Sequence, residues 1–344
     1  MFFLSEEKRW LNFIALLILA IPSCRETPPI EGNQPSLSII TPNHLLGVTS
    51  PAKDHIWIVG LNSTILHSNN GGRNWLYQKS PIEIDLYDVF FIDLENGWAV
   101  GKHGTILRTE NGGKEWIKVD TLTDQRLFDV HFVNARAGWT VGSWGIILHT
   151  KDGGKSWEKQ GSGEDKIYNG LWFVDNREGW IVGEYGTILH TEDGGMHWVR
   201  QQCNDIIPVV KEDEWETPTP SLYGVYFQNP RRGWAVGLDG IIIYTEDGGN
   251  YWRKLESPAE FTLYKIMVIN HNGWAVGSRG GYVSSTDGGY TWILKEGVIK
   301  TRFWLRDLAF SDKLHGWVVG SSGTITTTAN SGGTWRLVSG IPVG

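Results

Sequence analysis

The chain has few cysteines, no large excess of charge of either sign and no familiar catalytic signature. It contains 2 Cys among 344 residues, so a framework of several disulfides is excluded. The 31 Lys and Arg against 38 Asp and Glu give a net charge of -7, which lacks the clustered positive charge of a nucleic-acid-binding surface. No metal-binding motif, phosphate-binding loop or nucleophile elbow occurs in the sequence. We therefore expect no nucleic-acid partner, no metal and no cofactor.

An apolar run over residues 10–21 follows two basic residues at the amino terminus. It is shorter than the ~20 residues of a bilayer-spanning helix and is typical of a secretory signal. The run ends in Ile21-Pro22-Ser23-Cys24, which resembles the bacterial lipobox. The resemblance implies a lipoprotein signal peptide over residues 1–23 and lipid attachment at Cys24. An ordinary signal peptide with an incidental cysteine is the alternative.

Residues 24–42 contain four prolines and little apolar periodicity, which predicts a flexible tether. The predicted domain organisation is thus a signal peptide over 1–23, a tether over 24–42 and a folded domain over 43–344. With Cys24 lipidated, we expect the protein at the cell envelope, anchored by its lipid in the periplasm or on the outer-membrane surface.

Glycine and tryptophan are abundant, at 43 and 19 residues, and the tryptophans follow a repeat. An aromatic strand signature, mostly Gly-Trp-x-Val-Gly, recurs at intervals of 41, 41, 41, 54, 40 and 43 residues, and a second tryptophan follows each one 18 residues later. The first tryptophans are Trp57, Trp98, Trp139, Trp180, Trp234, Trp274 and Trp317. A repeat of about 40 residues is typical of propeller blades.

Each repeat contains four short apolar stretches bounded by turn residues, such as Leu86–Ile92, Trp98–Gly101, Thr105–Thr109 and Trp116–Val119. We name these strands A to D. A four-stranded meander cannot bury both of its faces alone, so the copies must pack against one another around an axis. The sequence therefore predicts an all-β, seven-bladed β-propeller of four-stranded antiparallel blades, with Trp335–Val338 as the outer strand of the last blade.

Between strands C and D lies the run Thr/Ser-x-Asp/Asn-Gly-Gly-x-x-Trp, which resembles the Asp-box of sialidase-type and sortilin-type propellers. We expect its acidic or amide side chain to accept hydrogen bonds from its own turn, while the glycines adopt positive φ. This structural role is predicted for Asn70, Asn111, Asp152, Asp193, Asp247, Asp287 and Asn330. Calcium binding by these side chains is the alternative.

The Gly-Trp-x-Val-Gly signature coupled to the Asp-box is similar to the photosystem II assembly and stability factor family of seven-bladed propellers. The resemblance covers roughly residues 45–335. It implies a non-catalytic protein that binds a protein partner, since the photosynthetic members bind newly made reaction-centre subunits, and bacterial members are often lipoproteins. The matching motifs belong to the scaffold, so the resemblance places no partner-binding residue on this chain.

An antiparallel meander puts the A–B and C–D turns at one end of the ring, and the B–C turns and D–A connections at the other. We call these ends the box face and the variable face, because the B–C turns differ from copy to copy within a fixed frame. The 54-residue interval adds an insertion at residues 203–220, also at the variable face. Exposed aromatics are favoured anchors in protein interfaces. The predicted partner-binding residues are His103, Trp144, Tyr185, Trp215, Asp239, Arg279 and Trp304.

The A strands should line the ring axis, where the sequence places three aspartates and a lysine. These positions read Gly47, Asp88, Asp129, Gly170, Gly224, Lys265 and Asp307. We expect solvated residues, with an ion or ligand site as the alternative. A carbohydrate-binding or sialidase-like glycoside hydrolase is the rival function, with a glycan as partner and Asp88 and Asp129 as candidate carboxylates. The arginine cluster that a sialidase needs is not recognisable, so we predict a membrane-associated protein-binding role without catalysis.

Overall fold

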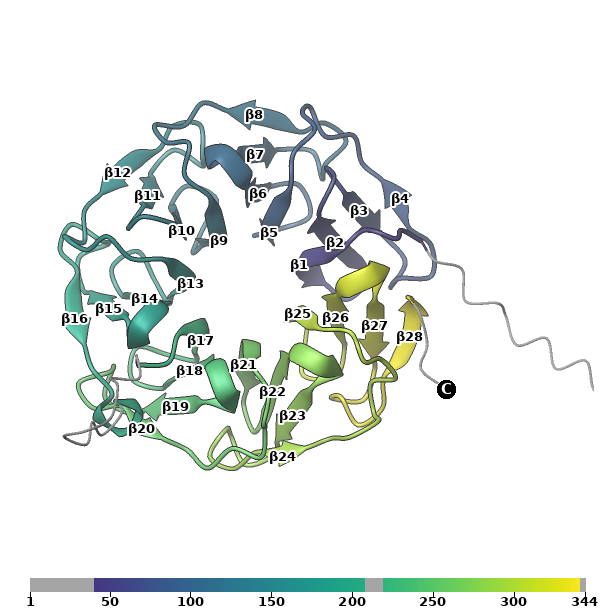
Figure 1. The fold of residues 1–344 in the computed structure, drawn as a ribbon. Coiled ribbons are helices and arrows are strands. Elements are labelled where there is room, and N and C mark those ends of the chain that lie inside the picture. Colours follow the sequence, from purple (N-terminus) through teal and green to yellow (C-terminus); the bar gives the residue numbers. More distant parts are fainter. Residues whose placement is uncertain (1–39, 208–218, 341–344) are drawn as a thin grey trace, which may run out of the picture. The chain divides into compact units, whose positions relative to one another are not determined.

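The protein forms a ring of seven antiparallel four-stranded sheets, shown end-on in Figure 1. The computed structural model describes residues 40–207 and 219–340. Each sheet is a meander of four strands consecutive in the sequence, and the sheets are blades 1 to 7 in chain order. The predicted all-β seven-bladed propeller is confirmed. The predicted signal peptide and Cys24 lie outside the described residues, and no described helix is long and apolar enough to cross a membrane.

Strands A and B form the inner half of each blade. The A strands, which lie nearest the axis, are β1 (Leu45–Ala52), β5 (Leu86–Phe91), β9 (Leu127–Phe132), β13 (Tyr168–Phe173), β17 (Leu222–Phe227), β21 (Leu263–Ile269) and β25 (Leu305–Phe310). The B strands are β2 (His55–Gly60), β6 (Gly97–Gly101), β10 (Gly138–Gly142), β14 (Gly179–Gly183), β18 (Gly233–Gly237), β22 (Asn272–Gly277) and β26 (Gly316–Gly320).

Strands C and D complete the blades. The C strands are β3 (Ile65–Ser68), β7 (Ile106–Thr109), β11 (Ile147–Thr150), β15 (Ile188–Thr191), β19 (Ile242–Thr245), β23 (Tyr282–Ser285) and β27 (Ile325–Thr328). The D strands are β4 (Leu76–Tyr77), β8 (Ile117–Val119), β12 (Glu158–Gln160), β16 (Val199–Gln201), β20 (Arg253–Lys254), β24 (Ile293–Leu294) and β28 (Arg336–Ser339). Strand β28 pairs with β27, which confirms the carboxy-terminal segment as the outer strand of blade 7.

In blades 2, 3, 4, 5 and 7, the glycine of the Gly-Trp pair makes room for a phenylalanine ring of the A strand. A Cβ atom on Gly97 would lie 2.3 Å from the Phe91 ring, so only glycine leaves room for that ring. The Phe91 ring in turn stacks on Trp57 of the preceding blade, with centroids 3.9 Å apart. The same stack joins Trp98 to Phe132 at 3.5 Å. One glycine therefore enables the aromatic contact that locks two blades together.

The hydrophobic core is divided among the boundaries between blades. Seven buried clusters occur within residues 40–207 and 219–340, and each combines side chains of two neighbouring blades. The cluster between blades 1 and 2, for example, joins Trp57 and Ile65 to Leu86 and Leu107. Burying such apolar surface is the main favourable term in folding, and here it requires a closed ring.

The Asp-box turns are held by their own side chains. In blade 2 the Oδ1 atom of Asn111 accepts the backbone N–H of Glu115 at 3.0 Å and the Thr109 hydroxyl at 3.0 Å. The same hydroxyl oxygen accepts the N–H of Gly113 at 2.9 Å. Equivalent oxygens of Asn70, Asp152, Asp193, Asp247, Asp287 and Asn330 accept the N–H four residues further on.

Candidate partner-binding face

The variable face is built on B–C turns of nearly identical backbone. Five of them contain short 3-10 turns, η1 (Lys102–Gly104), η2 (Glu184–Gly186), η4 (Leu238–Gly240), η5 (Ser278–Gly280) and η6 (Ser321–Gly323), while η3 (Asn204–Ile206) begins the insertion. In blade 2 the N–H of Lys102 donates to the carbonyl of Asp85 in the same blade. The N–H of Gly104 donates to the carbonyl of Gln125, which leads into blade 3. In blades 1, 2, 3 and 7, backbone bonds to two blades thus hold the turn in place.

The middle residue of every B–C turn has a left-handed backbone. The φ values are 55° for Asn62, 54° for His103, 58° for Trp144, 53° for Tyr185, 54° for Asp239, 59° for Arg279 and 53° for Ser322. Bulky side chains rarely adopt this conformation, which costs about 1–2 kcal/mol for residues other than glycine. Strained backbone of this kind clusters at functional sites.

Two of these strained positions present aromatic side chains to solvent. Trp144 is 68% exposed and Tyr185 is 49% exposed. They occupy the same turn position in neighbouring blades 3 and 4, and the ammonium of Lys166 lies 4.7 Å from the centre of the Tyr185 ring. Leu238, which is 37% exposed, lies in the equivalent turn of blade 5. We call these three side chains the apolar arc.

The other predicted partner-binding residues fall into three groups. His103, Asp239 and Arg279 are exposed at the variable face. Trp304, which immediately precedes β25, is half-buried against His44, with ring centroids 5.2 Å apart. Trp215 lies outside the described residues.

Cys203, at the start of the predicted insertion, is a buried residue of the hydrophobic core. It is 3% exposed, in the core between blades 4 and 5. Burial raises the pKa of its thiol, and its Sγ atom donates to the carbonyl of Trp252 at 3.5 Å. A buried thiol with a raised pKa is a poor nucleophile.

A groove hollows the variable face at blade 6, between the connections that lead into blades 6 and 7. Its volume is about 850 Å³, and the strained Arg279 lies on its wall. Phe261 and Ile299 supply apolar surface. The charged side chains of the lining are Glu260, Arg279, Lys295, Glu296, Lys300 and Arg302. Four cations against two carboxylates give the groove a positive character that the acidic chain as a whole lacks.

The aspartates near the axis are buried, so the expectation of solvated residues is wrong. Asp88, Asp129 and Asp307 are 7%, 9% and 4% exposed. The Oδ2 atom of Asp88 accepts the backbone N–H of Val130 in the next blade at 2.9 Å. In the same way, Asp129 Oδ2 accepts the backbone N–H of Leu171 at 2.8 Å, and Asp307 Oδ2 accepts that of Val48 at 2.7 Å. Each carboxylate is buried because it replaces a missing backbone partner at a boundary between blades.

Lys265 is the counter-ion of these carboxylates. Its Nζ atom lies 3.6 Å from Asp307 Oδ1 and 3.9 Å from Asp129 Oδ1. Burial, and then the charge of Asp129, raises the pKa of Asp88. Burial alone lowers the pKa of Lys265, but the neighbouring carboxylates outweigh it and raise that pKa. Asp88 and Asp129, the candidate carboxylates for a hydrolase, therefore already accept backbone N–H groups, and Asp129 also lies close to Lys265.

The sequence interpretation missed a second ring of axial side chains. An irregular register places one extra residue before each of the seven axial positions selected from the sequence, as between Leu86 and Asp88. These residues surround a cavity of about 20 Å³ near the variable face. They are Leu46, Tyr87, Phe128, Asn169, Tyr223, Tyr264 and Arg306. The seven-fold spacing would have revealed them, because each one precedes a position already selected.

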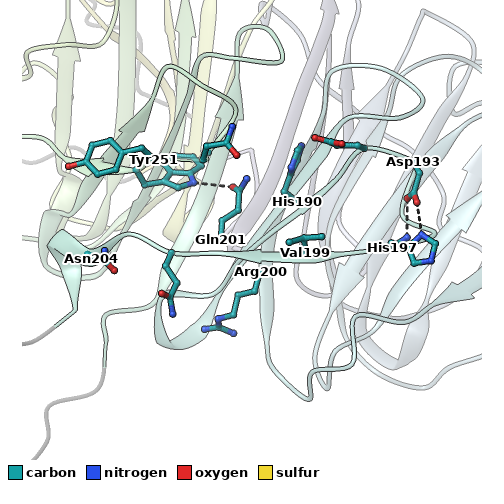
Figure 2. A pocket seen from close by; sticks show the side chains of 13 residues that line it. His190, Asp193, His197, Val199, Arg200, Gln201, Asn204 and Tyr251 are labelled. Carbon is teal, nitrogen blue, oxygen red and sulfur yellow. Dashed lines mark hydrogen bonds and ion pairs between the residues drawn. The ribbon is translucent and has the colours of Figure 1, made fainter.

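A further cavity, of about 710 Å³, lies between blades 4 and 5 beside the Asp-box turns (Figure 2). Two ion pairs involve its lining: His197 Nδ1 lies 2.7 Å from Asp193 Oδ2, and Arg200 contacts Glu164 at 2.6 Å. Gln201 accepts the indole N–H of Trp252 at 3.1 Å. In the described part of the chain, no group of three His, Cys, Asp or Glu residues could hold a metal ion.

Comparisons with known proteins agree with this architecture. The solved structure "YCF48 bound to D1 peptide" matches with a TM-score of 0.69 at 21% identity, over 85% of this chain and 93% of that chain. YCF48 from Cyanidioschyzon merolae matches with a TM-score of 0.68 at 18% identity, over 87% and 98%. An ancestral GH74 enzyme has a TM-score of 0.68 at 13% identity, but the match covers 88% of this chain and 47% of the enzyme. These likenesses establish the shared fold.

The family itself is established by sequence. No curated protein matches the chain. The family described as photosynthesis system II assembly factor YCF48 matches residues 35–123, 75–161, 109–211 and 208–298, which together span most of the propeller. The chain belongs to the YCF48 family of photosynthesis system II assembly factors.

Proposed function

We propose that this protein binds a protein partner through its variable face and acts, without catalysis, as an assembly or stability factor for a membrane complex. The observation that carries the proposal is Trp144, an indole that is 68% exposed on a left-handed backbone with φ of 58°. The left-handed backbone is common to all seven B–C turns, but the exposure of a large indole does not benefit the isolated propeller. A partner that covers the indole provides a reason for this exposure.

The remaining surface suggests the chemistry of the partner. Tyr185 and Leu238 are exposed in the B–C turns of the next two blades after that of Trp144, and the cationic groove beside Arg279 lies on the same face. A peptide segment with apolar anchors and acidic side chains matches both features. Family membership supports this choice, as does the related propeller solved with a D1 peptide.

We further propose that Cys24 carries a lipid that holds the protein at the cell envelope. The lipobox-like sequence before Cys24 supports this assignment. Metabolic labelling with a lipid precursor should mark the wild-type protein and leave Cys24→Ser unlabelled. Equal labelling of both proteins would exclude the anchor without affecting the binding proposal.

Site-specific photocrosslinking tests the binding face. A photoreactive side chain at position 144 should yield a discrete adduct with a membrane protein. The matched control is position 251, because Tyr251 is 60% exposed in an Asp-box turn on the opposite face. The double variant Trp144→Ala and Tyr185→Ala, with the photoreactive group at position 279, should lose the adduct.

Three outcomes contradict the proposal. They are equal crosslinking at positions 144 and 251, no adduct at position 144, and an adduct at position 279 that survives the double variant. Turnover of a chromogenic glycoside by the purified protein would instead support the hydrolase alternative. That assay should include Asp88→Asn and Asp129→Asn to exclude a contaminating enzyme.

A further inference from the structure

One of the seven boundaries between blades lacks a bond that the other six share. In six blades the indole N–H of the B-strand tryptophan donates to a backbone carbonyl in the Asp-box turn of the next blade. The pairs are Trp57 to Gly112, Trp98 to Gly153, Trp139 to Gly194, Trp180 to Gly248, Trp234 to Gly289 and Trp274 to Ser331, at 2.8–3.4 Å. The seventh indole, Trp317, is 3% exposed, and its Nε1 atom has no hydrogen-bond partner among the described residues.

Trp317 belongs to the boundary between blade 7 and blade 1, which we call the seam. Its Nε1 atom would lie 3.4 Å from a Cβ atom placed on Gly72, so the indole still faces the Asp-box turn of the next blade. A buried donor without an acceptor destabilises the folded protein. The cost is removed if an acceptor enters from outside the chain.

A cavity of about 360 Å³ opens beside this indole, on the box face of the seam. Its lining brings Lys53 and Arg73 from blade 1 together with Arg336 from blade 7. Asp54 is the one carboxylate in the described lining. Lys53, Arg73 and Arg336 make no salt bridge among the described residues. We call this space the seam cavity.

The cavity between blades 4 and 5 shows that this charge is specific to the seam. Five repeat positions line both cavities, and three of them differ in their guanidinium or carboxylate groups: Ala329, Arg336 and Arg73 at the seam correspond to Glu192, Val199 and Asn250. At these three positions the seam therefore has one carboxylate fewer and two guanidinium groups more. The indole of the blade 4–5 boundary, Trp180, is already bonded to Gly248 at 3.0 Å.

We propose that the seam cavity binds a small oxyanion, a carboxylate or a phosphate group on a free small molecule. The planar guanidinium groups of Arg73 and Arg336 suit paired oxygen atoms, and Lys53 adds a point charge. The Trp317 N–H gains the acceptor that six other blades take from a backbone carbonyl. Because the ligand contacts both blade 7 and blade 1, its binding stabilises the closed ring.

Titration of the protein with sodium phosphate and with citrate, against sodium chloride of equal ionic strength, tests this site. The indole ¹⁵N–¹H signal of Trp317 is identified by its absence in Trp317→Phe. One or both oxyanions should move this signal with saturation and raise the unfolding temperature, whereas chloride should do neither. A response to phosphate alone or to citrate alone supports the site and identifies its preferred group.

Two arginine variants provide the matched comparison. Arg336→Gln should weaken oxyanion binding roughly tenfold or more, because a charge-assisted hydrogen bond is lost. Arg200→Gln, which alters an arginine on the outer strand at the blade 4–5 cavity, should leave binding unchanged. The proposal is wrong if the Trp317 signal ignores both oxyanions, or if the two variants bind equally. Both measurements are independent of any protein partner.

Discussion

The indole N–H of Trp274 donates to the carbonyl oxygen of Ser331 across the boundary between blades 6 and 7, at 2.8 Å. The two residues are 57 positions apart in the sequence. The same indole stacks on Phe310 with ring centroids 3.8 Å apart. Trp274 thus fastens its blade to the next by a hydrogen bond and an aromatic contact, whereas Trp317, one blade later, has no such bond among the described residues.

This difference predicts unequal costs for one substitution at two repeat positions. Trp274→Phe removes the hydrogen bond to Ser331 and leaves that carbonyl without its indole donor. Trp317→Phe removes an N–H that has no acceptor among the described residues. The free energy of unfolding should therefore fall by about 1 kcal/mol more for Trp274→Phe. Urea denaturation of both variants measures the difference, and equal losses would contradict the account.

The ring was predictable from the sequence because its packing is periodic. In five blades the glycine of the Gly-Trp pair leaves room for a phenylalanine of the A strand, so Gly97, Trp98 and their counterparts recur at nearly constant spacing. The strand boundaries followed to within a residue or so, since turn residues separate the short apolar stretches. The positive φ of Trp144 was not predictable from its residue type, because aromatic residues rarely adopt it.

Contacts between distant residues were not predictable in the same way. Asp88 looked like a solvated residue, but an irregular register turns its carboxylate towards the N–H of Val130 in the next blade. Trp304 is covered by His44, which lies at the other end of the propeller sequence. The seam cavity likewise joins residues from blades 1 and 7, whose proximity follows from ring closure.

Lys265 should stabilise the propeller by neutralising the buried aspartates. Lys265→Met leaves Asp129 and Asp307 without their counter-ion, which should destabilise the protein by about 3 kcal/mol near neutral pH. Burial raises the pKa of Asp88 and of Asp307. A carboxyl group whose pKa is raised by folding destabilises the folded state while it is ionised and less so once it is protonated. The loss of unfolding free energy in Lys265→Met should therefore shrink as the pH falls.

Urea denaturation at about pH 7 and about pH 5 checks this expectation. Lys118→Met is the control, because Lys118 is an exposed lysine on a D strand. Its unfolding free energy should change little at either pH. A Lys265→Met loss that is the same at both pH values would show that the lysine acts by packing and not by charge.

The Asp-box carboxylates should make the propeller sensitive to acid. The backbone N–H of His197 and further donors lower the pKa of Asp193 to about 2. Burial opposes the effect at Asp152 and Asp287, but hydrogen bonds outweigh it and lower their pKa values to about 2 as well. A pKa lowered by folding adds stability above the unfolded value of about 3.9, and this is lost as the pH falls towards about 2.

Asparagine at these three positions should therefore flatten the acid dependence. Three native turns already use asparagine, and Asn111 accepts the N–H of Glu115 at 3.0 Å. The triple variant Asp152→Asn, Asp193→Asn and Asp287→Asn should match the wild type near neutral pH and lose less stability below about pH 4. Thermal unfolding across this range is the measurement, and parallel curves would refute the assignment.

Trp144 should show that stability has been given up for binding. Glycine adopts a φ of 58° without a steric penalty, so Trp144→Gly should raise the free energy of unfolding by about 1 kcal/mol. Lys102→Gly, one residue before a left-handed position in blade 2, should lower it, because Lys102 does not have a positive φ. Urea denaturation measures both changes. Since the exposed indole is the proposed anchor, Trp144→Gly should also lose the partner, and a variant that is more stable yet binds normally would separate the strain from the function.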